Sequence, residues 1–397
     1  MTVGGSESVV LAGPKRTPIG AFQGSLSTVS AQHLGAIAIR SALNAADVLP
    51  NSVDEVIMGN VLQAGLGQAP ARQAAIYAGL PDSVECLTIN KMCGSGLKAV
   101  MLASQAIQTG DASVIVAGGM ESMTQAPYLL PKARDGYRLG HADIVDSMII
   151  DGLWDVYNDR HMGNCADMCA EKYSFSREEQ DAFTKESYTR AQRAQSEGKF
   201  ADEIVSVEVK DRRENVSEVS VDDEPGKADF EKMTKLKPAF GKEGTVTAAN
   251  ASKINDGAAA LVVLDENKGA ELKVKPVARI LAQASVAQEP EWFTTAPVGA
   301  IQKVLKKAGL EMSDIDLFEI NEAFSNVAMA AMKELDISHD VVNVNGGAVA
   351  LGHPIGASGA RILVTLLHAM KTRGAKRGLA AICIGGGEAS ALIVEAL

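Results

Sequence analysis

The stretch "NKMCGSGLKAV", Asn90 to Val100, recurs near the other end of the chain as "HPIGASGARIL", His353 to Leu363. Two further pairs follow in the same order. They are "DEVIMGNV" with "DIDLFEINEAF", and "VIVAGGMES" with "AICIGGGEAS", which aligns Glu121 with Glu388. All three pairs lie about 260 residues apart, and similarity at one offset is the signature of a repeated unit. We therefore expect a duplicated fold; the alternative is chance similarity between glycine-rich turns.

Short apolar runs alternate with amphipathic stretches toward both ends of the chain. The runs "SVVLAG" (8–13), "DEVIMGNV" (54–61) and "ASVIVAGG" (112–119) predict buried strands. Helical periodicity appears in "AQHLGAIAIRSALNAA" (31–46) and "GLKAVMLASQAIQTG" (96–110). Alternation of this kind predicts an α/β layered architecture.

The middle of the chain has a different composition. It holds most of the tyrosines and the long polar run "KDRRENVSEVSVDDEPGKADFEKMTKLK". We interpret it as a mostly helical insertion with exposed loops. The predicted division is an N-terminal half at 1–124 plus 245–275, an inserted loop domain at 125–244, and a C-terminal half at 276–397.

Charge and cysteine content exclude several classes of protein. A net charge of −11 argues against general nucleic-acid binding, which needs a basic surface. Five cysteines without a CxxC pair indicate neither a disulfide framework nor a zinc site, and favour a reducing compartment. The start lacks a signal-peptide pattern and no apolar run reaches membrane-spanning length, so we expect no membrane partner and a cytoplasmic location.

Four polar or reactive residues lie where strands end at glycine-rich turns. A thiol at Cys93, close to a helix N-terminus, would have its thiolate stabilised, although a small buried hydrophobe is the alternative. His353 precedes Pro354 and could take a proton from that thiol, or be an ordinary core histidine. Cys383 precedes three glycines that could form an oxyanion hole or only pack. Asn321 could hold an oxygen or cap the next helix.

The other candidates have simpler explanations. Cys165 and Cys169 share a helix face, where core packing explains them better than metal, and Cys86 fits a strand interior. Neither a dinucleotide fingerprint nor a phosphate-binding loop is present in the sequence. The lysines from Lys227 to Lys242 either form a solvated loop or meet a phosphate-bearing ligand.

Taken together, these motifs resemble the thiolase family in its acetoacetyl-CoA branch. The resemblance spans nearly the whole chain and rests on "NKMCGSGLKA", "VAGGMESM", "HMGNCAD", "VTAANASKINDGAAAL", "INEAF", "NVNGGAVALGHPIGASGAR" and "CIGGGEAS". It implies the thiolase fold, with duplicated α/β halves in α-β-α-β-α layers. It also implies reversible condensation of two acetyl-CoA to acetoacetyl-CoA and CoA through an acetyl-cysteine.

The resemblance gives each turn a role. Cys93 matches the nucleophile, and His353 the histidine that activates it and faces the thioester oxygen of the second substrate. Asn321 matches the residue that holds a water beside that oxygen, and Cys383 the acid/base cysteine. The backbone N–H groups of Cys93 and Gly385 match a second oxyanion hole.

The resemblance also implies ligand contacts and assembly. Met162 in "HMG" matches a residue that narrows the acyl pocket to short chains. The positions matching CoA contacts are Tyr188, Lys227, Ala228, Asp229, Lys232, Ser252, Met162, His161, Leu153, Phe240, Ala248, Ala323 and Phe324. Potassium ligands of a relative match Tyr188 and the carbonyls of Ala248, Ala249, Ala251 and Val349, so the resemblance also implies potassium as an activator. Beyond CoA and acetyl-CoA no bound cofactor is expected, and the expected assembly is a homotetramer of tight dimers.

Three other enzymes and a non-catalytic CoA-binding protein are the alternatives to this function. A longer-chain 3-ketoacyl-CoA thiolase shares the motifs, whereas a ketoacyl synthase would need a different histidine or lysine set. A silent CoA-binding protein would not need all four catalytic positions. A nicotinamide-dependent dehydrogenase fails for want of its fingerprint.

Overall fold

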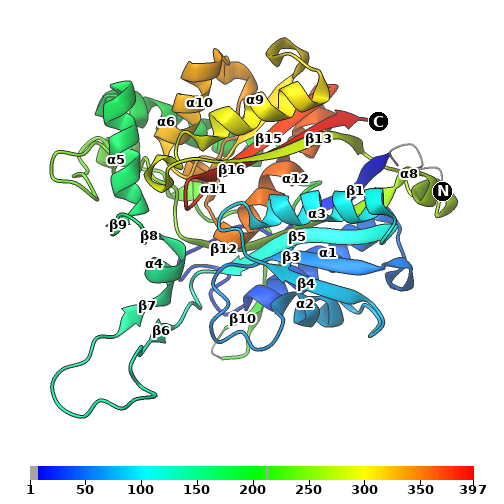
Figure 1. Ribbon diagram of the computed structural model, residues 1–397, viewed down its shortest axis with the longest axis horizontal. Helices are drawn as coiled ribbons and strands as arrows, with labels where there is room; N and C mark the ends of the chain where they lie inside the picture. Colours follow the sequence, from blue (N-terminus) through cyan, green and yellow to red (C-terminus); the bar gives the residue numbers. More distant parts are fainter. Residues whose placement is uncertain (1–7, 212) are drawn as a thin grey trace.

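The computed structural model describes residues 8–211 and 213–397, so the first residues, which show no signal-peptide pattern, lie outside the described part. Two groups of strands form the centre of the molecule (Figure 1). The first has the order β4 (Glu85–Ile89), β3 (Glu55–Gly59), β5 (Val114–Ser122), β12 (Asn255–Asp265) and β1 (Val9–Arg16). The second has the order β13 (Ala278–Ala287), β16 (Glu388–Ala396), β15 (Arg377–Ile384) and β14 (Leu317–Ile320). A short pairing of β1 with β13 joins the groups into one continuous sheet.

The two groups share one topology, which confirms the predicted duplication. In the first, β3 and β5 are parallel, and β5, β12 and β1 follow as antiparallel neighbours. In the second, β14 and β15 are parallel, and β15, β16 and β13 follow as antiparallel neighbours. The loop contacts also repeat. The Asp54 carboxylate accepts hydrogen bonds from the N–H groups of Ser113 and Val114, where β5 begins. The Asp316 carboxylate accepts the equivalent bonds from Lys376 and Arg377, where β15 begins.

This repeat corrects one predicted equivalence. The two aspartates align Val114 with Arg377, which places Glu121 opposite Ile384 rather than Glu388. The sequence alignment fails there because β5 continues beyond Glu121, whereas β15 ends at Ile384 and turns through three glycines into β16. Glu388 therefore begins the returning strand.

Helices cover both outer faces and fill the space between the two groups. The outer pairs are α1 (Ala31–Ala46) with α2 (Pro70–Ala78), and α9 (Ala296–Ala308) with α10 (Ser325–Leu335). Between the groups lie α3 (Ser95–Thr109) and α12 (Ile355–Arg373) (Figure 1). Alternate residues of β12 enter different cores, one with α1 and the other with α3 and α12. The predicted order of five layers is confirmed.

The two inner helices cross at the glycines of the recurring stretches. A Cβ atom on Gly96 would lie 2.6 Å from the backbone nitrogen of Ala360, and one on Gly359 would lie 2.3 Å from that of Leu97. The backbones therefore approach more closely than any larger residue permits. The recurrence of "GSG" and "ASG" is thus a packing requirement of this crossing.

Between β5 and β12 the chain leaves the sheet, and its described residues there form four helices and three two-stranded ladders. Residues 130–144 form a long loop that projects from the body of the molecule (Figure 1). The elements of this region are β6 (Tyr128–Leu129), β7 (Val145–Asp146), α4 (Ser147–Gly152), β8 (Trp154–Asp155), β9 (Arg160–His161), α5 (Met162–Tyr173), α6 (Arg177–Ser196), β10 (Val207–Lys210), β11 (Val216–Val219) and α7 (Phe230–Met233). The remaining elements are β2 (Gly20–Ala21), α8 (Glu266–Glu271), α11 (Ala348–Leu351) and short 3-10 turns at Pro50–Ser52, Pro225–Lys227, Pro290–Trp292, Met312–Asp314 and His339–Val341.

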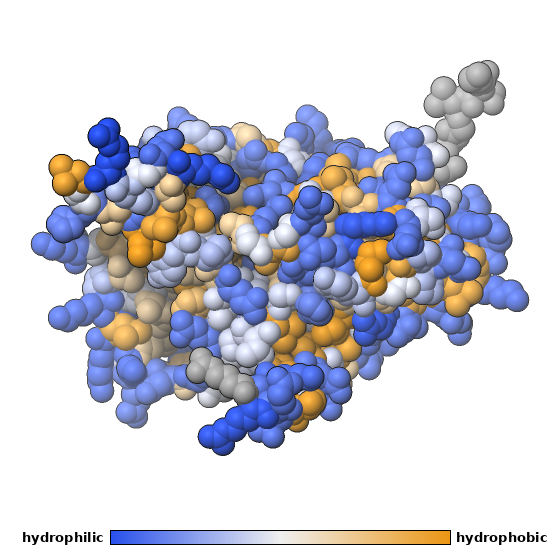
Figure 2. All heavy atoms as spheres, turned by 90° about the horizontal axis from the view of Figure 1, so that it is seen from below, coloured by the Kyte–Doolittle hydropathy of each residue, from blue (hydrophilic) through white to orange (hydrophobic). Residues whose placement is uncertain are grey.

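The surface is mixed rather than uniformly polar. Figure 2, a view from below, shows hydrophilic side chains over most of this face with apolar patches between them. Among the described residues, the helices are too short or too polar to cross a membrane.

Candidate active site

The first candidate, Cys93, lies in the tight turn between β4 and α3. Asn90 accepts a bond from the N–H of Met92 at 2.9 Å, and the Ser95 hydroxyl donates to the Met92 carbonyl at 2.6 Å. Met92 itself has φ 47°, a left-handed conformation that a non-glycine residue adopts at a cost. Two local bonds thus hold a strained backbone immediately before Cys93.

The backbone N–H groups of Gly385 and of Cys93 itself favour the ionised Cys93 sulfur and lower its pKa. Those are the two donors that the resemblance places in an oxyanion hole. Burial nevertheless raises the pKa of the Cys93 thiol to about 11. The N–H groups of the turn do favour the thiolate, as predicted, but desolvation outweighs them, and the resting group is a thiol.

His353 is buried at the entry to α12, and its environment fixes its tautomer. The Ser358 hydroxyl donates to the Pro354 carbonyl at 2.9 Å, and its oxygen lies 2.6 Å from Nδ1 of His353. Because a hydroxyl carries one proton, Nδ1–H must be the donor to Ser358. Nε2 then keeps its lone pair, and it is buried without a hydrogen-bond partner in the described part of the chain.

The charge state of His353 follows from the same surroundings. Burial lowers its pKa to about 3, and the nearby Arg361 guanidinium adds to this effect. The imidazole is therefore neutral at pH 7 and can accept a proton at Nε2.

Asn321 and Cys383 end the neighbouring strands β14 and β15. The Asn321 N–H donates to the Ala381 carbonyl at 2.9 Å, which fixes its backbone. Both polar atoms of its side chain are buried and lack partners among the described residues. The next helix, α10, has Phe324 at its N-cap, so Asn321 is not that cap. A buried amide of this kind is poised for a water or a ligand oxygen.

Cys383 lies close to the first cysteine. Burial raises the pKa of the Cys383 thiol well above its ordinary value, and the neighbouring Cys93 sulfur raises it further. The structure thus brings Cys93, Cys383 and Gly385 together, and Cys93 packs against an apolar cluster that includes Ile355, two residues after His353.

Sequence reasoning missed three residues that position this centre. Ser358 orients the His353 ring, and Asn255 Oδ1 accepts a bond from the His353 N–H at 2.9 Å. Glu121 accepts bonds from Gly356 at the start of α12 and from Asn60, Val61 and Leu62. Burial raises the pKa of Glu121 to about 7. Glu121 was noted only as part of a repeat, and Ser358 and Asn255 lie inside quoted motifs, so a search for polar neighbours of the key residues could have found them.

Most predicted acyl-pocket residues form one apolar wall. Met162, Phe240, Ala323 and Phe324 belong to the same cluster as Cys383. His161 stacks on Phe240 with ring centroids 4.7 Å apart. Leu153 packs in the adjoining cluster with Cys93. Ser252 donates its N–H to the Ala323 carbonyl at 3.0 Å, while Ala248 is exposed at the rim.

The predicted CoA contacts farther along the chain form a second group. Lys227 and Lys232 are exposed, and Asp229 caps α7 by accepting the Lys232 N–H at 3.0 Å. Tyr188 is buried and packs with Val349, Ala228 and Phe230. These side chains therefore form two sets: the exposed lysines Lys227 and Lys232, and an apolar cluster around the buried Tyr188.

Some of the predicted potassium ligands contact Lys253, a side chain that the sequence analysis did not consider. Nζ of Lys253 donates to the Ala249 carbonyl at 2.9 Å and to the Ala251 carbonyl at 2.7 Å. It also lies 5.8 Å from the centre of the Tyr188 ring. Three of the five predicted ligand residues thus already contact an amine.

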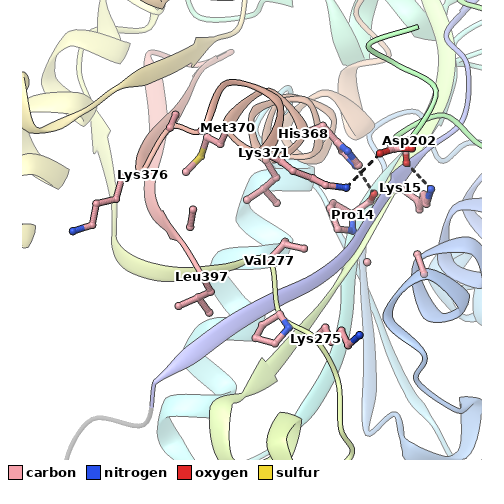
Figure 3. Close-up of a pocket in the computed structure, with 17 residues that line it drawn as sticks. Pro14, Lys15, Asp202, Lys275, Val277, His368, Met370, Lys371, Lys376 and Leu397 are labelled. Atoms are coloured by element: carbon pink, nitrogen blue, oxygen red, sulfur yellow. Dashed lines mark hydrogen bonds and ion pairs between the residues drawn. The ribbon is translucent and has the colours of Figure 1, made fainter.

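Two cavities differ in their relation to this centre. One, of about 550 Å³, is lined by Met162, Trp154, Gly385 and Met92, the residue before Cys93. Another, of about 780 Å³, lies at the far end of α12 between β1, β13 and the C-terminus (Figure 3). Its four lysines are Lys15, Lys275, Lys371 and Lys376, and none of the predicted site residues lines it.

The remaining cysteines are structural. Cys165 and Cys169 are buried on α5, and Cys86 is half-buried in β4 beside Arg72. Burial raises the pKa of all three thiols. In the described ranges, no cluster of histidine, cysteine and carboxylate side chains could hold a metal ion.

A half-buried cysteine close to a second cysteine, together with a buried imidazole nitrogen and a buried amide that lack partners among the described residues, fits an acyl-transfer centre with a thioester intermediate. Family comparison agrees with this class. The model "Thiolase, N-terminal domain" matches residues 9–267, and "Thiolase, C-terminal domain" matches residues 274–396. The chain belongs to the thiolase family.

Within that family the chain is similar to proteins of one specificity. It is 54% identical to acetyl-CoA acetyltransferase 2 of Arabidopsis thaliana over 391 residues, and this alignment covers 98% of this chain and 97% of that protein. It is 53% identical over 388 residues to the acetyl-CoA acetyltransferase of Cupriavidus necator, covering 98% and 99%.

Solved structures agree. The Acat5 thiolase of Ascaris suum, in complex with coenzyme A, matches with a TM-score of 0.94 at 44% identity, covering 98% of this chain and 100% of that one. The acetyl-CoA acetyltransferase of Bacillus anthracis matches with a TM-score of 0.96 at 42% identity, covering 99% of each chain.

Proposed function

We propose that this chain is an acetyl-CoA acetyltransferase, an acyltransferase that condenses two acetyl-CoA to acetoacetyl-CoA and CoA, reversibly. The observation that carries the proposal is the set of unpartnered buried polar atoms on residues that the fold places at strand and helix ends, as it does the two neighbouring cysteines. Nε2 of His353 and the side-chain amide of Asn321 lack partners in the described residues, and two backbone N–H groups converge on the Cys93 sulfur. Buried polar groups are costly without partners, so such a group supports a ligand site.

The first half-reaction forms an acetyl-cysteine. Nε2 of His353 takes the proton of the Cys93 thiol as the sulfur attacks the acetyl-CoA carbonyl, so charge develops only during the step. The N–H groups of Cys93 and Gly385 stabilise the oxyanion. When the C–S bond to CoA breaks, Cys383 gives its proton to the departing CoA thiolate and becomes a thiolate itself.

The second half-reaction forms the carbon–carbon bond. The Cys383 thiolate takes a methyl proton from a second acetyl-CoA, and Nε2–H of the imidazolium, with a water held by Asn321, stabilises the enolate oxygen. The enolate carbon attacks the acetyl group on Cys93. The intermediate collapses to acetoacetyl-CoA, and the expelled Cys93 thiolate recovers its proton from His353. Because burial raises the pKa of Cys383 well above the ordinary value, its thiolate is a strong base for this step.

The apolar wall supports a short acyl chain. Met162 is buried in the cluster that contains Cys383, where it limits the space beside the nucleophile. Phe240, Ala323 and Phe324 supply the apolar contacts for pantetheine, with Leu153, His161, Ala248 and Ser252 at its edges. Lys227 and Lys232 supply positive charge for the CoA phosphates, together with Ala228, Asp229 and the buried Tyr188.

The assembly and the compartment are also proposals. Exposed apolar side chains at Leu87 on the edge strand β4 and at Leu139 on the projecting loop support a homotetramer built from dimers. The acidic surface and the free cysteines are consistent with a reducing compartment, and the cytoplasm is the proposed location.

The test is CoA-dependent loss of acetoacetyl-CoA by the wild type and by Cys93→Ala. We expect rapid loss with the wild type and none with the variant, and a mass increase of one acetyl group on the wild-type Cys93 peptide. Equal loss in both would overturn the mechanism, and loss in neither would favour a silent CoA-binding protein. Faster turnover of a long-chain 3-ketoacyl-CoA would assign the long-chain specificity instead.

A further inference from the structure

The positions that match potassium ligands do not fit a potassium ion in this chain. A potassium site needs free carbonyl oxygens that face a shared space. Here the carbonyls of Ala249 and Ala251 both accept bonds from Nζ of Lys253, at 2.9 and 2.7 Å. Those lengths are normal for a charge-assisted N–H···O bond, so the carbonyls are already satisfied.

Tyr188, another predicted ligand, also lies near this amine. Tyr188 presents its ring to Nζ at 5.8 Å, within the range of a cation–π contact. Tyr188 packs in one buried cluster with Val349, whose N–H donates to the Glu322 carboxylate at 3.1 Å. Lys253 thus lies among the same elements that a potassium ion would join.

The charge of the neighbourhood matches a single cation. Glu322 and Glu224 are both buried, and both attract the ammonium of Lys253. Glu322 also accepts bonds from Ser187 and Asn343, at 2.8 Å each. An ammonium and a potassium ion carry the same charge and are similar in size. A second cation beside the ammonium would meet like charge in a poorly solvated place.

We propose that the Lys253 ammonium takes the place of potassium in this enzyme, so that its activity needs no monovalent metal ion. The Lys253 amine connects the loop of residues 248–252, through its carbonyls, to the ring of Tyr188. The same loop carries Ala248 and Ser252 at the rim of the acyl pocket. Lys253 is therefore a positioning residue that acts through the loop. The activity measurement below rests on the proposed function, whereas the thermal measurement does not.

The experiment compares chloride salts of potassium, sodium and tetramethylammonium at equal ionic strength. For the wild type we expect thiolysis rates within about twofold of one another and equal thermal midpoints, since no ion binds the folded state selectively. For Lys253→Thr, which removes the amine and opens the space it fills, we expect a rate in sodium about tenfold lower. Potassium should restore most of that rate and raise the midpoint by a few degrees.

Two further variants separate cation replacement from general damage. Lys253→Met keeps the stem but blocks the space, so its rate should stay low in every salt. Lys303→Thr is the matched control, because Lys303 also donates to a carbonyl, Ser285, at 2.8 Å, but on the exposed outer face at α9. It should behave as the wild type.

The proposal is overturned by severalfold activation of the wild type by potassium, by a potassium-dependent thermal midpoint in the wild type, or by Lys253→Thr retaining full activity in sodium. The wild-type rates and thermal midpoints in the three salts test the proposal even if the variants do not fold. An absence of turnover in every salt would refute the proposed function, while the thermal midpoints would still report on the cation site.

Discussion

At the active centre, burial and hydrogen bonding work against each other at a single sulfur. Two N–H groups favour the Cys93 thiolate, but desolvation is larger and raises its pKa to about 11. His353 is neutral because desolvation also lowers its pKa, to about 3. In the resting state Cys93 is therefore a neutral thiol and His353 a neutral imidazole. The thiolate and the imidazolium form only when substrate is bound.

This charge state predicts how Cys93 reacts with iodoacetamide in the absence of CoA. A raised pKa means that the thiolate fraction grows with pH up to the pKa, so the alkylation rate should rise about tenfold per pH unit between pH 7 and 9. Mass spectrometry of the Cys93 peptide measures this rate separately from the other cysteines, and Cys93→Ser is the blank. A plateau below pH 8 would instead indicate a resting thiolate–imidazolium pair.

Ser358 provides a second prediction at this scale. Without the Ser358 hydroxyl, the proton on Nδ1 of His353 has no acceptor, and the imidazole can carry its proton on Nε2 instead. Nε2 then has no free lone pair and cannot accept a proton from Cys93. We expect Ser358→Ala to lower kcat by about tenfold to a hundredfold, part of the usual contribution of a general base. KM for acetoacetyl-CoA should change little.

The matched control for that variant is Ser104→Ala. Ser104 is another buried helical serine, and its hydroxyl has no hydrogen-bond partner among the described residues. Unchanged kcat in Ser358→Ala, or an equal fall in the control, would contradict the assigned role. Acetylation of Cys93 in a single turnover should slow in Ser358→Ala alone.

At the scale of elements, the crossing of α3 and α12 positions the two residues that we propose as nucleophile and base. Cys93 lies two residues before α3, and His353 lies two residues before α12. Both helices begin at the glycine-rich stretches that cross. The separation of the two catalytic groups therefore depends on how closely these helices pack.

Gly96→Ala tests this dependence. Its Cβ would lie 2.6 Å from a backbone nitrogen, so the helices must separate, and overpacking of this kind costs about 1–3 kcal/mol. We expect a lower thermal midpoint and a loss of activity in the fraction that remains folded. Gly226→Ala is the control, since a Cβ there meets nothing within 4 Å and its φ is not left-handed. Equal midpoints for the two variants would show that the crossing tolerates expansion.

For the whole molecule, the duplicated sheet explains why one site needs both halves. Cys93 and its turn come from the first group of strands, whereas Asn321, Cys383 and Gly385 come from the second. The equivalent edges of two repeated units face each other across the inner helices. The proposed boundaries at residues 124, 244 and 275 remain a prediction.

The projecting loop gives a prediction at this scale. Leu139 is 100% exposed and Ile144 is 66% exposed, an arrangement that indicates a partner surface. Replacing residues 131–143 by a short glycine-serine linker should reduce the mass in light scattering from a tetramer to a dimer. Thiolysis per subunit should persist, because the loop lies outside the catalytic cluster. An unchanged mass would place the subunit contact elsewhere, with Leu139→Ser as a milder variant of the same test.

The sequence by itself determined the layered α/β class, the duplication and the set of turns that carry the chemistry. Periodicity and glycine position are local properties, and α1 spans Ala31–Ala46 as its pattern predicted. Family resemblance then supplied roles for Cys93, His353, Asn321 and Cys383 that spacing had left open.

Only the tertiary structure decided the charge of Cys93, the tautomer of His353, the register at Glu388 and the contacts of Lys253. Each depends on groups brought together by folding: the burial of a thiol, the hydroxyl that faces Nδ1, the strand that turns back, and the loop whose carbonyls converge on one amine. A sequence pattern reports which residues are available. Desolvation and hydrogen-bond geometry arise only when the two halves close on each other.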